Sequence, residues 1–516
     1  MKTIYKRQII FTLIILLLFQ GLFSACAKKE SQDNSGIYGS VSELAPKIQG
    51  SISLFTTEVD TFNPLQTKNY YLTAFLGIVY EGLVVNDQEY NASPILADSW
   101  TSSNNNKKWT FNLSKGVKWH NGTNFSSSDV YNTVNFINSN NYSGPYQAFL
   151  ANVSSVSKPD FYSVVFLLNS PDPCFVNKMI FPILASSDIK GINNNKPFKV
   201  NGTGPYKYRY VKGNTWTYER FSSWHMKNVL FAKYNQYPPF IKKILLKNYK
   251  SPAEALGGFL RGEIDVYLSS DYSAIKSINN GYNSYDTISN RFTMLVLNTE
   301  VGILKNQSFR KLLQTYINKS ALIRECFDNN TIVENLPNIP AQFDKEYFNF
   351  DPASNGTLPT GINIKKLPPI ELLVNIENSD RCRVADALQK KLGERGIKIN
   401  VKKILFNQFT NRIDTKNYQI ALVGFDTPSS PDFRFTLKYN KNDTLSHIMN
   451  SWANETDPNK RKLMYGKIIE VVADQVPIIG LYKYKSSILS NRRILGSLSS
   501  DARFPYNNIA ECSVSY

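Results

Sequence analysis

The chain has 516 residues, of which 42% are hydrophobic and 13% aromatic, and this length allows roughly three domains of about 150 residues with sizeable cores. Its formal net charge of +18 comes from 59 Lys and Arg residues against 41 Asp and Glu residues. Because the lysines fall in scattered doublets and not in one patch, the charge indicates a solvated surface and argues against nucleic-acid binding.

The N-terminus has the layout of an export signal. Basic residues precede an apolar run at 9–19, and small residues then lead to Cys26. This predicts a signal peptide at 1–25 and lipidation of Cys26, with palmitate among the acyl chains. The alternative, an uncleaved anchor, is disfavoured because a membrane span needs about 20 apolar residues. Residues 26–48 read as a flexible polar tether, so we expect a lipid-anchored protein on the extracytoplasmic face of the cell membrane, the periplasmic side in a Gram-negative host.

The body begins with a predicted strand at 51–55 and continues into an informative stretch at 94–136. Residues 109–113 alternate apolar and polar side chains, which predicts a strand, and three asparagines at 104–106 predict the turn before it. A second short strand is predicted at 117–120 between glycine turns. Ser126 and Asp129 then supply caps for a helix.

The middle of the chain predicts further turns and helices. Gly202 and Gly204 predict a turn with positive φ that leads into a hairpin, and the absence of a third glycine argues against a nucleotide loop. Residues 254–266 predict a helix, a glycine C-cap and a buried strand. A strand at 291–298 and paired helices at 308–323 follow.

The C-terminal third predicts an α/β unit. After a Pro- and Asn-rich excursion at 331–369, a strand at 370–374, a helix at 383–393 and a strand at 397–404 form a βαβ unit and hence a parallel sheet. A buried strand from residue 420 is expected to end at Gly424, and ligands of open α/β sheets bind at such carboxyl ends. An amphipathic helix at 458–474 and a strand at 475–482 complete the pattern.

Five motifs occur in a fixed order: L-A-D-S-W at 96–100, K-G-V-K-W-H-N-G-T at 115–123, G-T-G-P-Y at 202–206, G-E-I-D at 262–265 and V-P-I-I-G-L-Y at 476–482. Their order and spacing resemble the family 5 extracellular solute-binding proteins, the peptide, dipeptide and nickel receptors of bacterial ABC importers. The resemblance implies an α/β, two-lobed, periplasmic-binding-protein-like fold of type II, class C, with an additional hairpin-rich subdomain.

The same resemblance implies the domain boundaries. Lobe one would span 49–290 and include the subdomain at about 66–200. Lobe two would span 291–477, and residues 478–516 would return to lobe one. The two crossing points would let the lobes close over a ligand as a hinge.

The resemblance also implies ligand contacts. Glu81 and Leu83 match the rim of the family's cleft, and Tyr146 matches an aromatic residue that packs over the bound peptide. The expected contacts from the second half of the chain are Gly424, Phe425, Asp426 and Tyr482. Phe425 stands where peptide receptors have Trp, and Asp426 or Asp432 would pair with the peptide α-amino group. An ordinary helix-end acid remains the alternative for Glu81, and a turn-capping residue the alternative for Asp426.

The sequence shows no enzyme or metal motif. G-x-S-x-G, H-E-x-x-H and P-loop patterns are absent, and the three histidines, at 120, 225 and 447, are far apart. His120 is expected to have a packing role. Besides Cys26 there are four cysteines at irregular spacing, which we expect to be buried free thiols, although disulfide pairing is possible: Cys174, Cys326, Cys382 and Cys512.

These features predict a non-enzymatic, monomeric lipoprotein without cofactor or metal that captures peptides and delivers them to an ABC transporter permease. One alternative is a nickel or metal-chelate receptor of the same fold, which the scarcity of His and of clustered Cys disfavours. A second is a surface lipoprotein that acts as an adhesin or as a peptide-pheromone sensor. An exported hydrolase ranks last.

Overall fold

The computed structural model describes residues 46–87, 90–140, 142–193, 197–234, 236–269, 278, 281–327, 330–336, 363–427, 443–498 and 504–515. The predicted signal peptide, Cys26, most of the tether and Asp432 lie outside these residues. In the described part of the chain, no helix is long and apolar enough to cross a membrane. Residues 46–516 form one compact unit, described below by its sheets and cores.

The first sheet combines the start of the chain with a later hairpin. Its order is β1-β10-β9-β8, with β1 parallel to β10 and the other pairs antiparallel. The bounds are β1 Gln49–Thr57, β8 Tyr206–Lys212, β9 Thr215–Arg220 and β10 Ile241–Tyr249. The predicted strand at 51–55 and the predicted hairpin after residue 206 are therefore confirmed. Helices α2 (Tyr70–Leu76), α6 (Lys227–Tyr234) and α7 (Pro252–Leu260) belong to the same part of the chain.

The second sheet contains the motif-rich stretch. It is antiparallel, in the order β4-β5-β7-β6, with bounds β4 Ala97–Ser103, β5 Lys108–Leu113, β6 Val153–Asp160 and β7 Ser163–Leu168. The asparagine turn at 104–106 is confirmed, and all three residues have φ between 50° and 61°. Helix α3 (Ser127–Ile137) begins as predicted, because Ser126 and Asp129 form a capping box. The predicted strand at 117–120 is wrong, since only an isolated bridge from Lys118 to Asn124 forms there.

Smaller elements complete this half of the chain. They are β2 Val84–Asn86, β3 Ala92–Pro94, α4 Gln147–Leu150, the 3₁₀ helix η1 Phe175–Lys178 and α5 Ser186–Asn193. Near the C-terminus, β18 Ile494–Leu495 pairs with β19 Ser513–Val514, and the 3₁₀ helix η5 spans Ile509–Glu511.

The third sheet has seven strands in the order β11-β17-β12-β16-β14-β15, and β13 also pairs with β17. The bounds are β11 Val266–Ser269, β12 Tyr282–Leu297, β13 Thr331–Val333, β14 Ile370–Asn375, β15 Ile399–Ile404, β16 Ile420–Asp426 and β17 Ile478–Asn491. The βαβ prediction is confirmed, because β14 and β15 are parallel. The parallel sheet extends only to β16, since β12 and β17 pair antiparallel with their neighbours.

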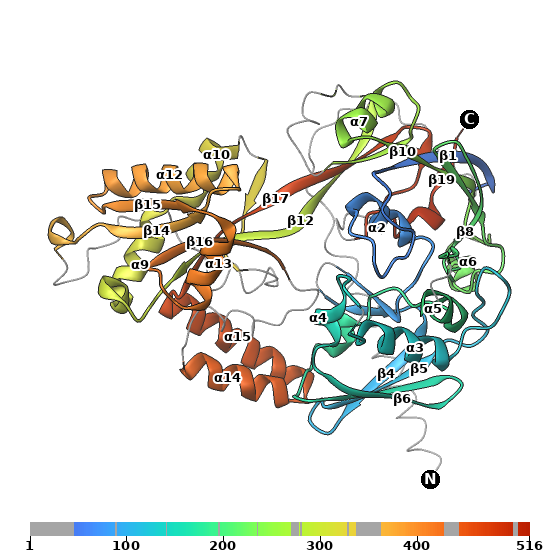
Figure 1. Cartoon of the computed structure of the whole chain (residues 1–516), viewed down its shortest axis with the longest axis horizontal. Coiled ribbons are helices and arrows are strands. Elements are labelled where there is room, and N and C mark those ends of the chain that lie inside the picture. The colour runs from blue at the N-terminus through green and yellow to red at the C-terminus, as the bar shows by residue number, and fades with distance from the viewer. Residues whose placement is uncertain are drawn as a thin grey trace, which may run out of the picture. The chain divides into compact units, whose positions relative to one another are not determined.

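In the sequence, the helices of this second half all lie between β12 and β17 (Figure 1). They are η2 Gly302–Lys305, α9 Gln307–Tyr316, α10 Lys319–Phe327, η3 Ile364–Lys366, α12 Ser379–Glu394, α13 Phe406–Asp414, α14 Asp443–Asn454 and α15 Pro458–Gln475. The paired helices predicted at 308–323 correspond to α9 and α10. The predicted C-terminal amphipathic helix corresponds to α15.

The apolar cores divide along the chain. One core collects buried residues from 52–268 and from 488–514, whereas two others draw almost entirely on 292–482. The long strands β12 and β17 pair with each other over most of their length, and β17 contributes to the cores on both sides (Figure 1). Their register is interrupted between Ile288 and Phe292, between the stretches that belong to different cores. The predicted domain boundaries are compatible with this division and remain predictions.

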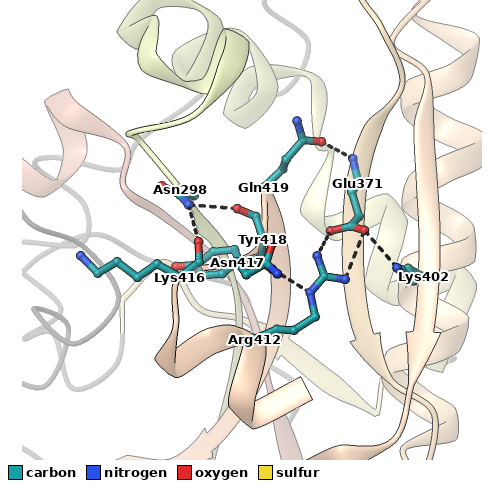
Figure 2. A network of polar contacts seen from close by, with 8 residues as sticks. All are labelled: Asn298, Glu371, Lys402, Arg412, Lys416, Asn417, Tyr418 and Gln419. Carbon is teal, nitrogen blue, oxygen red and sulfur yellow. Dashed lines mark hydrogen bonds and ion pairs between the residues drawn. The ribbon is translucent and has the colours of Figure 1, made fainter. Parts of the chain in front are cut away.

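A polar network fixes the amino-terminal end of β16 (Figure 2). The guanidinium of Arg412 donates two hydrogen bonds to the carboxylate of Glu371, at 2.6 and 3.3 Å. The amide of Asn298 donates to two carbonyls of the α13–β16 loop, and Gln419 accepts the backbone N–H of Glu371. These contacts tie the start of β16 to β14, to α13 and to the end of β12.

Candidate functional site

The ligand site was predicted at the carboxyl end of the strand that is now β16. Since β14, β15 and β16 are parallel, their carboxyl ends meet at one edge of the sheet. The strand does not end at Gly424 as predicted, because Phe425 and Asp426 continue it by pairing with Phe292 and Arg291 of β12. The ring of Phe425 packs edge-on against Phe292, with 5.8 Å between centroids. We call this edge, formed by residues 375, 404 and 424–426, the carboxyl edge.

Asp426, the predicted partner of a peptide ammonium group, is exposed. Its carboxylate lies 3.5 Å from Nε of Arg291, and both side chains are more than half exposed, at 60% and 57%. Such an exposed ion pair contributes little to stability and rearranges easily. The Asp426 carboxylate is therefore accessible, but it already lies beside a cation.

Gly424 makes room for an arginine that sequence reasoning missed. A Cβ atom at Gly424 would lie only 2.2 Å from Nη1 of Arg381. Arg381 is the third residue of α12, and its Nε and Nη2 donate to Oδ1 of the buried Asn375 at 3.0 and 2.7 Å. Burial lowers the pKa of the Arg381 guanidinium, and the hydroxyls of Tyr482 and Tyr484 oppose that shift. The only sequence signal for this contact is that Arg381 follows shortly after Asn375, the last residue of a strand.

Glu81 lies in a buried polar cluster. Its carboxylate accepts a hydrogen bond from Nε1 of Trp224 at 2.9 Å and lies 3.1 Å from Nε2 of His225. Burial alone would raise the pKa of Glu81, but His225 and Trp224 hold it below its usual value. Both partners come from the segment after β9, which carried no motif in the sequence.

The other predicted contacts are mostly buried. Leu83 and Tyr482 are completely buried, and the ring of Tyr482 packs 4.7 Å from that of Phe327. This burial speaks against a direct side-chain contact with a solute for either residue. Tyr146 is half-buried beside Phe181, and burial raises the pKa of its hydroxyl. The structure thus brings Gly424, Phe425 and Asp426 together, while the contact role of every predicted residue stays a prediction.

The sequence model of the bacterial extracellular solute-binding proteins, family 5 (middle region), matches residues 91–445. The chain belongs to this family. The predicted membership is thereby confirmed on a match that covers well over half of the chain.

Relatives of this family match along nearly the whole chain. The oligopeptide-binding protein AppA of Bacillus subtilis is 22% identical over 521 residues, which cover 92% of this chain and 93% of AppA. The solved structure of the periplasmic murein tripeptide binding protein MppA, in an unliganded open form, superposes with a TM-score of 0.72 at 17% identity and covers 91% of this chain and 98% of MppA. NikA from Brucella suis in complex with Fe(III)-EDTA gives a TM-score of 0.68 at 18% identity, over 90% and 100% of the two chains. These likenesses confirm the predicted two-lobed α/β fold.

The family's G-T-G-P-Y motif is held by close backbone packing. Neither Gly202 nor Gly204 has a positive φ, so that prediction is wrong. A Cβ atom would instead lie 1.8 Å from the carbonyl oxygen of Val79 at Gly202, and 2.6 Å from that of Ile78 at Gly204. Glycine is required there because two backbone segments touch.

His120 of the family's tryptophan-containing motif bonds to the same turn. Its Nε2 donates to the carbonyl of Gly204 at 2.9 Å, and its Nδ1 accepts the N–H of Gly202 at 3.2 Å. Burial lowers the pKa of His120 to about 4, which keeps the imidazole neutral. Both ring nitrogens serve the fold, in line with the expected packing role.

The cysteines form no metal centre with other groups in the described ranges, where no set of three His, Cys, Asp or Glu residues is placed to hold an ion. Cys326 and Cys512 are buried free thiols as expected, Cys382 is a half-buried free thiol, and Cys174 is buried. Burial raises the pKa of the Cys512 thiol to about 12, so it stays protonated.

Proposed function

We propose that this chain is the substrate-binding component of a bacterial ABC importer and that it captures peptides between its two lobes for delivery to a membrane permease. The observation that carries the proposal is the similarity to an oligopeptide-binding protein along almost the whole length of both chains. The family match is consistent with the same role. No chemical change of the solute is part of this function.

The carboxyl edge would provide the contacts from lobe two. The exposed carboxylate of Asp426 could exchange Arg291 for a peptide ammonium group at small cost, because the existing pair is solvent-exposed. Phe425 would supply apolar area, and the absence of a side chain at Gly424 leaves the space that the guanidinium of Arg381 occupies beside it. From lobe one, Tyr146 and the buried Glu81 cluster are the proposed partners.

The absence of catalysis is also part of the proposal. Of the three histidines, His120 has both ring nitrogens bonded to backbone, and His225 pairs with Glu81. Neither is left as a general base beside a nucleophile in the part of the chain that the structure describes. A binding protein needs no such pair.

Lipid anchoring at Cys26 is proposed on the sequence pattern alone. It would place a monomeric body on the extracytoplasmic face, held by the tether at 26–48. Fractionation of cells that express the full chain or a Cys26→Ser variant tests this. The full chain is expected in the membrane fraction and the variant outside it, whereas equal membrane retention would contradict lipidation.

Native mass spectrometry tests the peptide function directly. The purified protein is incubated with a synthetic pool of peptides of two to ten residues, desalted, and measured intact. We expect mass increments that fragment as peptides, and fewer of them for Phe425→Ala. A thermal melt of the variant provides the folding control. An unliganded spectrum at saturating pool concentration would contradict the proposal.

A metal-chelate receptor is the second candidate, supported by the likeness to NikA. The described residues offer no cluster of metal-ligating side chains, but a chelate can be held without such ligands. The same native spectra, recorded after incubation with nickel and free histidine, separate the two. A nickel-histidine increment without any peptide increment would favour this candidate.

A further inference from the structure

The turn between β4 and β5 reaches a helix that belongs to the other half of the chain. The side-chain amide of Asn106 donates hydrogen bonds to the carbonyl oxygens of Ala453 and Glu455, at 3.4 and 3.0 Å. Ala453 lies in the last turn of α14, and Glu455 directly follows that helix. The contact joins residues that are 347 and 349 positions apart in the sequence. It therefore links the second sheet, which belongs to the first core, to a helix of the second half.

The carbonyl of Ala453 is one of the groups that a helix end leaves without a partner. The last four C=O groups of an α-helix have no intrahelical donor. Here the carbonyls of Ser451 and Trp452 accept the N–H of Glu455, whereas that of Ala453 accepts from Asn106. A side-chain amide has two N–H donors, which suits the two acceptors at this helix end. The negative end of the helix dipole also favours a donor there.

Asn106 is held in place by contacts within its own half of the chain. Oγ of Ser102 donates to Oδ1 of Asn106 at 3.0 Å, which directs Nδ2 toward the helix. The backbone carbonyl of Asn106 accepts Nε1 of Trp109 at 3.1 Å and the N–H of Asp172 at 3.3 Å. Its φ of 61° is left-handed, a conformation that asparagine tolerates better than most residues. These three hydrogen bonds do not involve α14, so they preorganise the amide donor independently of that helix.

The contact with α14 is buried. Asn106 is completely buried, although Asn104 and Asn105 of the same turn are exposed. Cys174, which is 6% exposed, belongs to the same core as Trp452 of α14. Figure 1 shows α14 beside the second sheet and away from β12 and β17, the strands that link the two halves. A contact distant from the linking strands resists separation of the halves where their movement would be large.

We infer that Asn106 is a positioning residue that fastens α14 to the second sheet when the two lobes are closed, and that it thereby slows release of the captured peptide. We call its contact with Ala453 and Glu455 the latch. This rests on the proposed peptide function and adds to it the contact that sets how long a peptide is held. An enclosed peptide leaves only after the lobes open, so a contact made in the closed state lengthens its residence without touching it.

An isosteric pair of variants tests the latch. Asn106→Asp keeps the shape of the side chain and its tolerance of the left-handed backbone, but it replaces the amide donor by a carboxylate that faces two carbonyl oxygens. The bond from Trp109 remains, because it uses a backbone carbonyl. Asn105→Asp is the matched control, since Asn105 lies in the same turn with a φ of 50°, is exposed, and gains the same charge.

Release is measured by isotope exchange. The protein is loaded with a synthetic pool of peptides of two to ten residues and chased with an excess of the same pool carrying heavy isotopes, and the remaining light peptide is followed by native mass spectrometry. Loss of the two hydrogen bonds predicts release roughly 10-fold faster for Asn106→Asp. Asn105→Asp should stay within about twofold of the unmodified protein. Ser102→Ala, which removes the hydroxyl that orients the amide, should release about threefold faster, and it replaces Asn106→Asp if thermal melts show that variant unfolded.

The outcomes separate the latch from the peptide function. Faster release from Asn106→Asp but not from Asn105→Asp supports the latch. Equal release from the two folded variants overturns it and leaves peptide capture standing. If the unmodified protein retains no peptide, the peptide function is overturned, and small-angle X-ray scattering of the two unliganded variants decides the latch. A larger radius of gyration for Asn106→Asp than for Asn105→Asp supports it, and equal radii overturn it.

Discussion

Replacing Gly202 by alanine should destabilise the first core strongly. The added Cβ would lie 1.8 Å from the carbonyl oxygen of Val79 and 2.6 Å from its carbon, roughly half to three-quarters of an ordinary contact of about 3.5 Å. The obstructing atoms are backbone, and the same carbonyl accepts the N–H of Gly204 at 3.0 Å. Gly202 also exchanges two hydrogen bonds with His120, at 2.8 and 3.2 Å.

The expected loss follows from these contacts. Overpacking costs about 1–3 kcal/mol, and each buried hydrogen bond that breaks adds roughly 1 kcal/mol. Together they give a decrease on the order of 4 kcal/mol in the free energy of unfolding for Gly202→Ala. Urea unfolding followed by tryptophan fluorescence measures it well, because five of the six tryptophans lie at or before residue 224.

Gly191→Ala is the matched control. Gly191 lies in helix α5, and no atom would lie within 4 Å of its added Cβ. Alanine is favoured over glycine inside a helix by up to about 1 kcal/mol, so this variant should be as stable as the unmodified protein or slightly more stable. A Gly202→Ala variant within about 1 kcal/mol of the unmodified protein would refute the close-packing argument.

Two further predictions concern buried charges. Because burial lowers the pKa of His120 from 6.5 to about 4, the unfolded chain binds a proton that the folded one excludes. Stability should therefore fall by about 2 kcal/mol between pH 7.5 and pH 5, and His120→Gln should lose that slope in urea titrations. Asp265, which is 4% exposed, accepts two hydrogen bonds from Arg493, at 2.8 and 2.6 Å. Asp265→Asn should lower the free energy of unfolding by about 3 kcal/mol. The control Asp386→Asn breaks an exposed pair with Lys403 and should leave the unfolding midpoint unchanged. Equal midpoints for the two variants would contradict the reasoning.

Local signals in the sequence were sufficient for much of the fold. The capping box at Ser126 and Asp129, the asparagine turn and the βαβ unit were all predictable, because each depends on neighbours within a few residues. The strand predicted at 117–120 failed for a tertiary reason. Val117 and Trp119 bond locally to Phe125 and Thr123, but the N–H of His120 bonds to the carbonyl of Gly202, 82 residues away.

The candidate site was less predictable. Gly424 to Asp426 could be proposed from the strand end and the family pattern, but the continued pairing of β16 with β12 could not be read from β16 alone. Arg381 was missed because its position depends on a hydrogen bond to Asn375 and on the absence of a side chain at Gly424. Burial of Tyr482 likewise depends on Phe327, which no local pattern indicates.

Small-angle X-ray scattering tests the central claim most directly, namely that two lobes linked through β12 and β17 close on a captured peptide. Profiles are recorded for the protein stripped of ligand and for the same protein saturated with a peptide identified by mass spectrometry. The account predicts a smaller radius of gyration in the saturated sample. An unchanged radius of gyration, with the peptide demonstrably bound, would contradict it.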